Sequence, residues 1–188
     1  MRFVMQKSYL AIDLRGYPSE LFEQVCQVLP WRDFQRTGRG LFGVEVEALF
    51  QLKSLPKADL VFAKGGAVQK NRKFLNSRWV NVLSRPYPFD SVQARLAAEH
   101  NIALELSFKE IESTIGYVRA RVLTHLQKTV TLARKYHAPM VITSGASAAE
   151  QVKSPRVLVA LGKILGLDYG EAKACIYTFP KKVLEGFK

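Results

Sequence analysis

Histidine and cysteine are scarce in this sequence, and their scarcity limits the chemistry that the chain can perform. The 188 residues include three histidines and two cysteines. No two histidines stand at the spacing of metal ligands, and Cys26 and Cys175 form no CxxC motif. Both cysteines sit in apolar patterns, so we expect buried thiols rather than a disulfide. We predict that the protein itself binds no metal and no cofactor.

Catalytic signatures and long apolar runs are also missing. The sequence contains no GxSxG, P-loop or GxGxxG motif, so nucleophilic catalysis and nucleotide-cofactor chemistry have no sequence support. No run approaches the roughly 18 apolar residues that a membrane-spanning helix needs, and residues 1–10 lack the apolar core of a signal peptide. We therefore predict a cytoplasmic protein that makes no membrane contact and supplies no catalytic residue.

The charge of the chain is strongly one-sided. There are 28 basic and 16 acidic residues, which gives a net charge of +12. The excess is uneven, because residues 61–140 contain thirteen basic and five acidic side chains. A field of this sign attracts polyanions and speeds their association. The alternative is that the charge serves only solubility, but so large an excess of basic over acidic residues favours nucleic acid as the partner.

The order of apolar patterns predicts the fold. Short apolar runs alternate with longer helical patterns, as in parallel βα units. We predict strands at Tyr9–Leu14, Leu41–Val46, Leu60–Ala63, Trp79–Leu83, Ile102–Leu106 and Met140–Thr143, with a candidate seventh near Cys175–Thr178. We predict helices at Ser19–Leu29, Glu47–Ser54, Ala67–Leu75, Asp90–His100, Gly116–Tyr136, Pro155–Leu165 and Tyr169–Ala174. This repetition indicates one α/β domain over residues 1–188, a closed or nearly closed barrel, with an open doubly wound sheet as the alternative.

The loops that follow the strands of such a barrel build its functional rim. In this chain those positions are mostly basic or small: Asp13, Arg15, Glu47, Lys64, Gly65, Gly66, Arg85, Ser107, Lys109, Ser144 and Gly145. Four acidic residues could bind magnesium or act as acid and base, namely Asp13, Glu45, Glu47 and Glu105. We favour a structural role for Glu45 and Glu105, pointing inward or paired with Lys64 or Arg85.

The segment from Lys64 to Lys73 combines glycines with cations. Gly65 and Gly66 would free backbone N–H groups at a helix N-terminus to approach phosphate. Countercharge would come from Lys64, Lys70, Arg72 and Lys73. The alternative is a turn that needs glycine, followed by a solvated helix face. The residues alone do not decide between the two.

The predicted helix Gly116–Tyr136 has two distinct faces. At 100° per residue, the face expected to pack inward contains Val118, Val122, Leu126, Val130 and Ala133. The opposite face has a stripe of cations seven residues apart, Arg121, Lys128 and Lys135. Any outer helix is solvated and often charged, but residues 119–135 contain no acidic side chain. That absence favours phosphate binding, because a purely solvating face usually mixes signs.

Several collinear segments share a pattern with a known family. They are Asp59–Gly66 with Asn71-Arg72, Val82–Pro86, Phe89-Asp90, Ala94–Ala97, Ile102–Leu106, Tyr117–Arg119, Ala133–Tyr136, Thr143–Ala146, Ser154–Arg156 and Ala160–Gly162. Together they resemble the archaeal ribonuclease P protein component 3 family over about residues 58–185. Residues 1–57 match it only loosely.

The resemblance implies a distorted TIM-like (β/α) barrel related to metal-dependent phosphoesterases, with the ancestral metal site lost. It implies a subunit of ribonuclease P, the RNA-based endoribonuclease that removes the 5′ leader of precursor tRNA. In that complex the RNA cleaves with magnesium, and this chain would bind RNA and assist without catalytic residues. The implied partners are the ribonuclease P RNA, the component 2 protein and other subunits, with precursor tRNA as the substrate. The isolated chain is expected to be inactive.

By motif match, RNA contacts are expected at Lys64, Asn71, Arg72, Arg85, Arg119, Lys135 and Arg156, with Ser144 shaping the rim. The cations singled out above add Lys70, Lys73, Arg121 and Lys128. Val157 stands where the family usually has an aspartate, so a local pairing with Arg156 is not carried over. Two alternatives stay open: a metal-dependent phosphoesterase of the same barrel lineage, and an RNA-binding barrel of another ribonucleoprotein.

Overall fold

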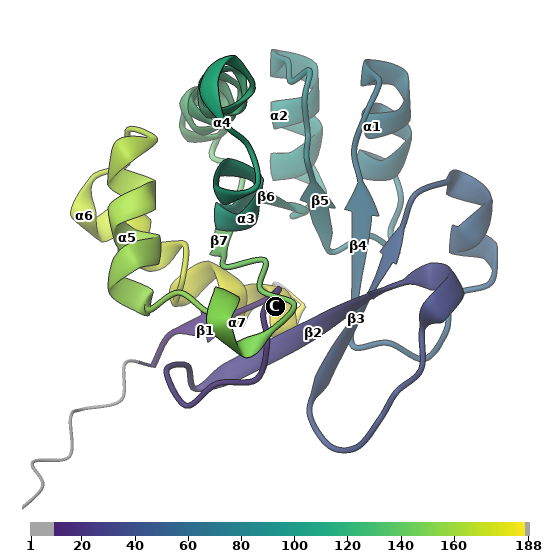
Figure 1. The fold of residues 1–188 in the computed structure, drawn as a ribbon. Coiled ribbons are helices and arrows are strands. Elements are labelled where there is room, and N and C mark those ends of the chain that lie inside the picture. The colour runs from purple at the N-terminus through teal and green to yellow at the C-terminus, as the bar shows by residue number, and fades with distance from the viewer. Residues whose placement is uncertain (1–9, 187–188) are drawn as a thin grey trace, which may run out of the picture.

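A curved, all-parallel sheet of seven strands forms the centre of the molecule (Figure 1). The computed structural model describes residues 10–186. Tyr9 of the first predicted strand, and residues 1–9 of the segment compared with a signal peptide, therefore lie outside the described residues. The strands pair in sequence order: β1 (Ile12–Asp13), β2 (Gln24–Pro30), β3 (Leu41–Val46), β4 (Leu60–Lys64), β5 (Val82–Ser84), β6 (Ala103–Ser107) and β7 (Met140–Thr143). This arrangement confirms the predicted α/β class and the distorted, nearly closed TIM-like barrel.

Alternate residues of each strand point into the barrel or outward beneath the helices. The inner cluster contains Ile12, Leu14, Cys26, Leu60, Phe62, Val82, Ala103 and Val141. Phe62 is fully buried there, and its ring lies close to Gly43 of the neighbouring strand β3. A Cβ at Gly43 would lie 3.1 Å from the Phe62 ring and 3.0 Å from Val28, so the glycine makes room for the phenyl ring.

The backbone of Cys175 and Ile176 closes the seam between the first and last strands. Ile12 donates its N–H to the carbonyl of Ile176 at 2.8 Å, and Ile142 donates to that of Cys175 at 3.0 Å. The predicted seventh strand in this region is wrong, because Cys175 ends one helix and another begins at Thr178. These two carbonyls nevertheless take the place of a strand at the seam.

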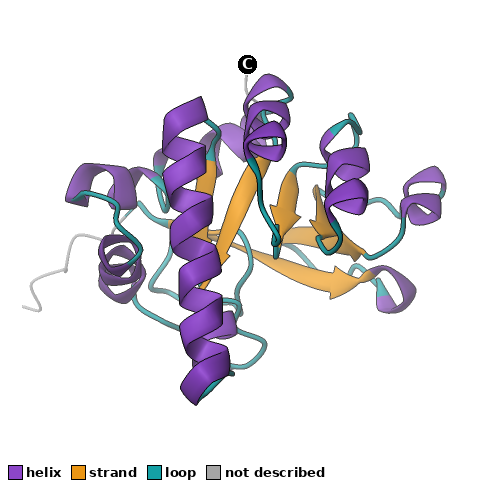
Figure 2. Cartoon of the chain, turned by 90° about the horizontal axis from the view of Figure 1, so that it is seen from above, coloured by secondary structure: helices purple, strands orange, loops and turns teal. Residues whose placement is uncertain are grey.

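Helices cover only part of the barrel. They are α1 (Val68–Leu75), α2 (Ser91–Glu99), α3 (Phe108–Glu112), α4 (Gly116–Tyr136), α5 (Pro155–Ile164), α6 (Tyr169–Ala174) and α7 (Thr178–Glu185), with 3-10 helices η1 (Trp31–Asp33), η2 (Leu49–Lys53) and η3 (Ala149–Gln151). In Figure 1, α1, α2 and α4 line the upper edge and α5 and α6 lie at the left, and Figure 2 shows α4 crossing the molecule. The inner cluster is completed by Val183 of α7. By contrast, β2 and β3 are followed only by the short helices η1 and η2.

The predicted helix Ser19–Leu29 is wrong, because a turn and then β2 occupy this segment. Its apolar residues fit a helical period, but Cys26 and Val28 alternate into the barrel. The strand pairs with β1 on one side and β3 on the other, and the hydrogen bonds of these two pairings outweigh the local preference for a helix.

The other helix predictions were met in part. The predicted helix Glu47–Ser54 is the shorter η2, and α3 and α7 were not predicted. The helices α4 and α6 are confirmed with their bounds.

Candidate functional site

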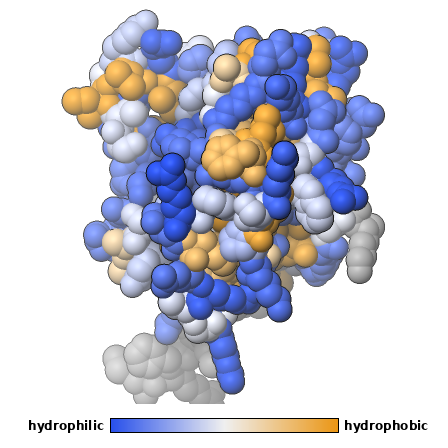
Figure 3. Space-filling view, turned by 90° about the vertical axis from the view of Figure 1, so that its right-hand side faces the viewer, coloured by the Kyte–Doolittle hydropathy of each residue, from blue (hydrophilic) through white to orange (hydrophobic). Residues whose placement is uncertain are grey.

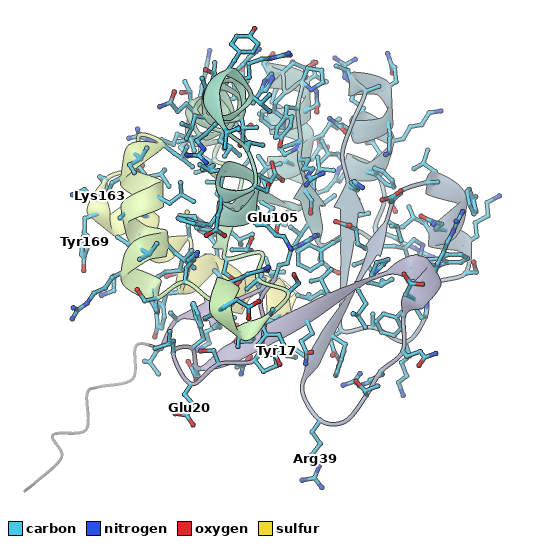
Figure 4. The ribbon with its side chains drawn as sticks, in the orientation of Figure 1. Tyr17, Glu20, Arg39, Glu105, Lys163 and Tyr169 are labelled. Atoms are coloured by element: carbon cyan, nitrogen blue, oxygen red, sulfur yellow. The ribbon has the colours of Figure 1, made fainter. Side chains whose placement is uncertain are left out.

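The mouth of the barrel, at the carboxyl ends of the strands, contains a cavity of about 350 Å³. Every strand or the loop after it contributes to the wall. The lining residues include Arg15, Tyr17, Gln27, Glu45, Lys64, Ser84, Arg85, Glu105, Ser107, Lys109, Glu110, Gly145 and Ser147. Glu105 lies near the middle of the ribbon in Figure 4, and Tyr17, in the loop that follows β1, is labelled below it. The cavity therefore brings together six of the eleven predicted rim positions, namely Arg15, Lys64, Arg85, Ser107, Lys109 and Gly145.

Arg15 occupies the centre of this mouth. Its Nη2 lies 2.7 Å from Glu45 Oε1, and its Nε lies 3.0 Å from Glu105 Oε1. The guanidinium also donates to Ser84 Oγ at 3.0 Å and lies over the ring of Phe62. Burial disfavours its charge, but Glu105 and Glu45 outweigh burial and raise the pKa of Arg15. Both carboxylates therefore pair with Arg15, and the expected partners Lys64 and Arg85 are wrong.

Asp13 joins β1 to the loop after β7. Its Oδ1 accepts the backbone N–H groups of Arg15 and Ser144, each at 3.2 Å. The side chain is almost wholly buried, and burial raises its pKa to about 7 against the opposing effect of these hydrogen bonds. Asp13 is therefore a structural clamp of the mouth whose ionisation falls near neutral pH.

The glycine turn after β4 is closed by internal hydrogen bonds. Gly65 donates its N–H to Ser84 O at 2.7 Å, and Gly66 donates to Asn71 Oδ1 at 2.8 Å. Of the two alternatives left open by the sequence, the structure favours the turn that needs glycine, because both N–H groups already have partners inside the protein. Glycine is needed at position 65 for space, since a Cβ would lie 2.3 Å from the carbonyl oxygen of Arg85.

Two of the expected RNA contacts lie inside the protein. Asn71 is fully buried, and its Nδ2 donates to Gln93 Oε1 at 2.9 Å while its oxygen holds Gly66. Ser144 is also buried, and its Oγ accepts the N–H of Ala146 at 3.1 Å. Both side chains support the rim from within.

Lys64 and Arg85 lie at the cavity, each beside an acidic residue. Lys64 Nζ is 2.6 Å from Glu47 Oε1, and this hydrogen bond lowers the pKa of Glu47. Arg85 is half exposed, and its Nε lies 3.1 Å from Oε1 of Glu110, a carboxylate that also accepts a hydrogen bond from Tyr87. Both cations remain partly open to solvent, so a phosphate can approach them.

The other expected cations lie on the outer helices. On α1, Arg72 pairs with Asp90 at 2.8 Å, whereas Lys73 is exposed and Lys70 is partly exposed. On α4, the stripe Arg121, Lys128 and Lys135 is exposed, as expected.

Three more residues named from the sequence lie on α4 and α5. Arg119 donates to the carbonyl of Thr114 at 2.6 Å, and Arg156 is exposed in the first turn of α5. Val118, expected to pack inward, is instead more than half exposed. The first turns of α4 therefore present an apolar side chain to solvent.

Arg15 and Lys109 are rim positions for which the sequence indicates no individual function. Lys109 Nζ donates to Ser147 Oγ at 2.9 Å across the mouth. Their position just after strands β1 and β6 predicts the rim, but their side-chain partners depend on the tertiary structure. Within residues 10–186 no cluster of three His, Cys, Asp or Glu side chains is arranged to hold a metal ion. No helix of this same stretch is long and apolar enough to cross a membrane.

Known proteins with similar sequences point to one family. The sequence profile of the family described as RNase P subunit p30 matches residues 45–186. Ribonuclease P protein component 3 of Methanothermobacter thermautotrophicus is 34% identical over 135 residues, which cover 69% of this chain and 55% of that protein. The same component of Thermococcus kodakarensis is 31% identical over 140 residues, which cover 71% of this chain and 63% of the relative.

A solved structure extends the likeness to most of the fold. It is a chain from a cryo-EM structure of archaeal ribonuclease P with mature tRNA, matched at a TM-score of 0.79 and 26% identity over 93% of this chain and 90% of that one. In sequence, the chain spans little more than half the length of the two relatives named above. On the family profile and the sequence identity, this chain belongs to the RNase P subunit p30 family.

Proposed function

We propose that this chain is a protein subunit of ribonuclease P that binds the RNA and assists removal of the 5′ leader from precursor tRNA. The observation that supports this most strongly is the likeness, over nine-tenths of both chains, to a chain of archaeal ribonuclease P with mature tRNA. Its partners would be the ribonuclease P RNA, the component 2 protein and other subunits. The complex would work in the cytoplasm on precursor tRNA, with magnesium required by the RNA.

The barrel mouth supports a role without catalytic residues. Glu45 and Glu105, the carboxylates most central to the mouth, are both held by the Arg15 guanidinium. A metal-dependent phosphoesterase would need such carboxylates available as ligands. The rim cations Lys64 and Arg85 instead suit phosphate contacts, which position an RNA backbone without chemistry.

The test is cleavage of precursor tRNA by the cognate ribonuclease P RNA at limiting magnesium, with and without this chain and the component 2 protein. Stimulation that needs both RNA and protein would support the proposal. Cleavage by the protein alone would favour the phosphoesterase, and binding to RNA without stimulation would favour another ribonucleoprotein. A control variant with one positive charge fewer, Lys163→Gln on the exposed face of α5, should stimulate cleavage as the unmodified chain does.

A further inference from the structure

A second cavity of about 320 Å³ lies beside the barrel mouth, after the carboxyl ends of β2 and β3. It is lined by Pro30, Trp31, Arg32, Asp33, Glu45, Glu47, Ala48, Phe50 and Gln51. Glu45 lines both cavities, so the two are adjacent. No long helix follows β2 or β3, which leaves this part of the rim open to solvent.

Two aromatic rings form one wall of this cavity. The ring centroids of Trp31 and Phe50 lie 6.4 Å apart with an interplanar angle of 80°. Trp31 is held in place, because its Nε1 donates to the carbonyl of Ser54 at 3.1 Å. Phe50 is 63% exposed, so much of its ring is available to a ligand. Figure 3 views the molecule from the side of η1, η2 and α1 and shows a central apolar patch on a mainly hydrophilic face.

The polar groups of the cavity complement those rings. Glu47 is exposed and accepts a hydrogen bond from Lys64, and Gln51 fixes the loop by accepting the N–H groups of Glu47 and Ala48. Carboxylates accept hydrogen bonds from the amino groups of nucleobases, and unpaired bases stack on aromatic faces. Lys64 lies between this cavity and the mouth, where it can meet a backbone phosphate.

We propose that Trp31, Phe50 and Glu47 form an aromatic subsite that binds one unpaired, amino-bearing base of an RNA strand whose backbone follows Lys64 and Arg85. The proposal rests on the RNA-binding function proposed above and adds to it a base contact. A single strand, rather than a duplex, is the ligand, because only an unpaired base exposes the face and edge that the subsite would contact.

Tryptophan fluorescence tests the subsite directly. The chain has two tryptophans, so Trp79→Phe leaves Trp31 as the sole reporter. Hexaadenylate should quench Trp31 emission, whereas an RNA duplex of the same length should bind by charge with little quenching. Hexauridylate, whose base has no amino group, should bind more weakly than hexaadenylate. Equal quenching by duplex and single strand would contradict base stacking.

Substitution of Phe50 separates aromatic stacking from general apolar contact. Phe50→Leu should weaken hexaadenylate binding about tenfold, and Phe50→Tyr should restore it, because stacking on an aromatic ring stabilises each base. The matched control is Trp79→Leu, which removes another exposed aromatic ring, one that lies beneath Arg78 and outside this cavity. It should leave binding unchanged.

The outcomes distinguish the two proposals. If the unmodified chain binds the RNA hexamer and Phe50→Leu binds it equally well, the aromatic subsite is wrong and the RNA-binding role stands. If the unmodified chain binds neither oligonucleotides nor ribonuclease P RNA, both proposals fail. Each variant replaces an exposed side chain, and an unchanged thermal unfolding midpoint would show that the fold is intact.

Discussion

Arg15 and Glu105 face each other across the barrel mouth, with Nε and Oε1 3.0 Å apart, and Glu105 has 2% of its side chain exposed. Glu105 also accepts a hydrogen bond from Thr143 at 2.7 Å. The guanidinium thus links β6 to the loop after β1 and, through Glu45, to β3. The mouth is shaped by this central ion pair network.

Removal of the Arg15 charge should destabilise the fold. Arg15→Met leaves two carboxylates without a counter-ion, and breaking such a buried pair costs about 3 kcal/mol in the free energy of unfolding. Urea denaturation would measure it. Adding Glu105→Gln to this variant should recover part of the loss. The control Arg36→Met breaks the exposed pair with Asp59 and should cost less than about 1 kcal/mol. Equal losses for the two arginines would contradict this account.

Asp13 should make stability depend on pH. Its pKa is 3.8 in the ordinary state and about 7 in the folded protein, so between these values the folded chain holds a proton that the unfolded chain has lost. Its contribution to stability is therefore full below about pH 4 and is lost as pH rises to about 7. Asp13→Asn cannot ionise, so its unfolding free energy relative to the unmodified chain should rise over that range. A difference that stays constant with pH would place the ionisation elsewhere.

Arg85 should contribute one phosphate contact to RNA binding. Arg85→Gln should weaken binding to ribonuclease P RNA and lower the slope of log K against log salt by about one contact. The measurement is a binding titration at several salt concentrations. Lys163→Gln removes the same charge from α5 and should leave the slope unchanged. Identical slopes for both variants would mean that only net charge matters.

Asn71 should matter for stability and not for the salt dependence of RNA binding. Asn71→Ala leaves the N–H of Gly66 and the amide of Gln93 without their buried partner, which costs about 1–3 kcal/mol. Denaturation would measure the cost, and the binding titration should give an unchanged salt slope at a temperature where the variant is folded. A lower slope with unchanged stability would instead make Asn71 a direct contact.

Local pattern was sufficient where an element keeps one periodicity. Helix α4 begins at Gly116 and ends at Tyr136 as predicted, because its heptad-spaced cations and buried Leu126, Val130 and Ala133 fit one helical period. The predicted helix at Ser19–Leu29 is wrong, because a short apolar run fits both periods and only pairing with β1 and β3 makes this segment a strand. The rim positions followed from topology, but the partner of Glu105 did not, because Arg15 is 90 residues away in sequence.

The sequence by itself determined the alternation of strands and helices from β4 to β7, the excess positive charge and the family of this chain. These properties depend on composition and on short-range periodicity, which one chain records directly. Only the tertiary structure decided that Arg15 neutralises the carboxylates of the mouth, that Asn71 is buried, and that Trp31 and Phe50 share a cavity. Those relationships depend on closure of the sheet, which brings loops from different strands to one end and fixes which polar groups lose contact with water.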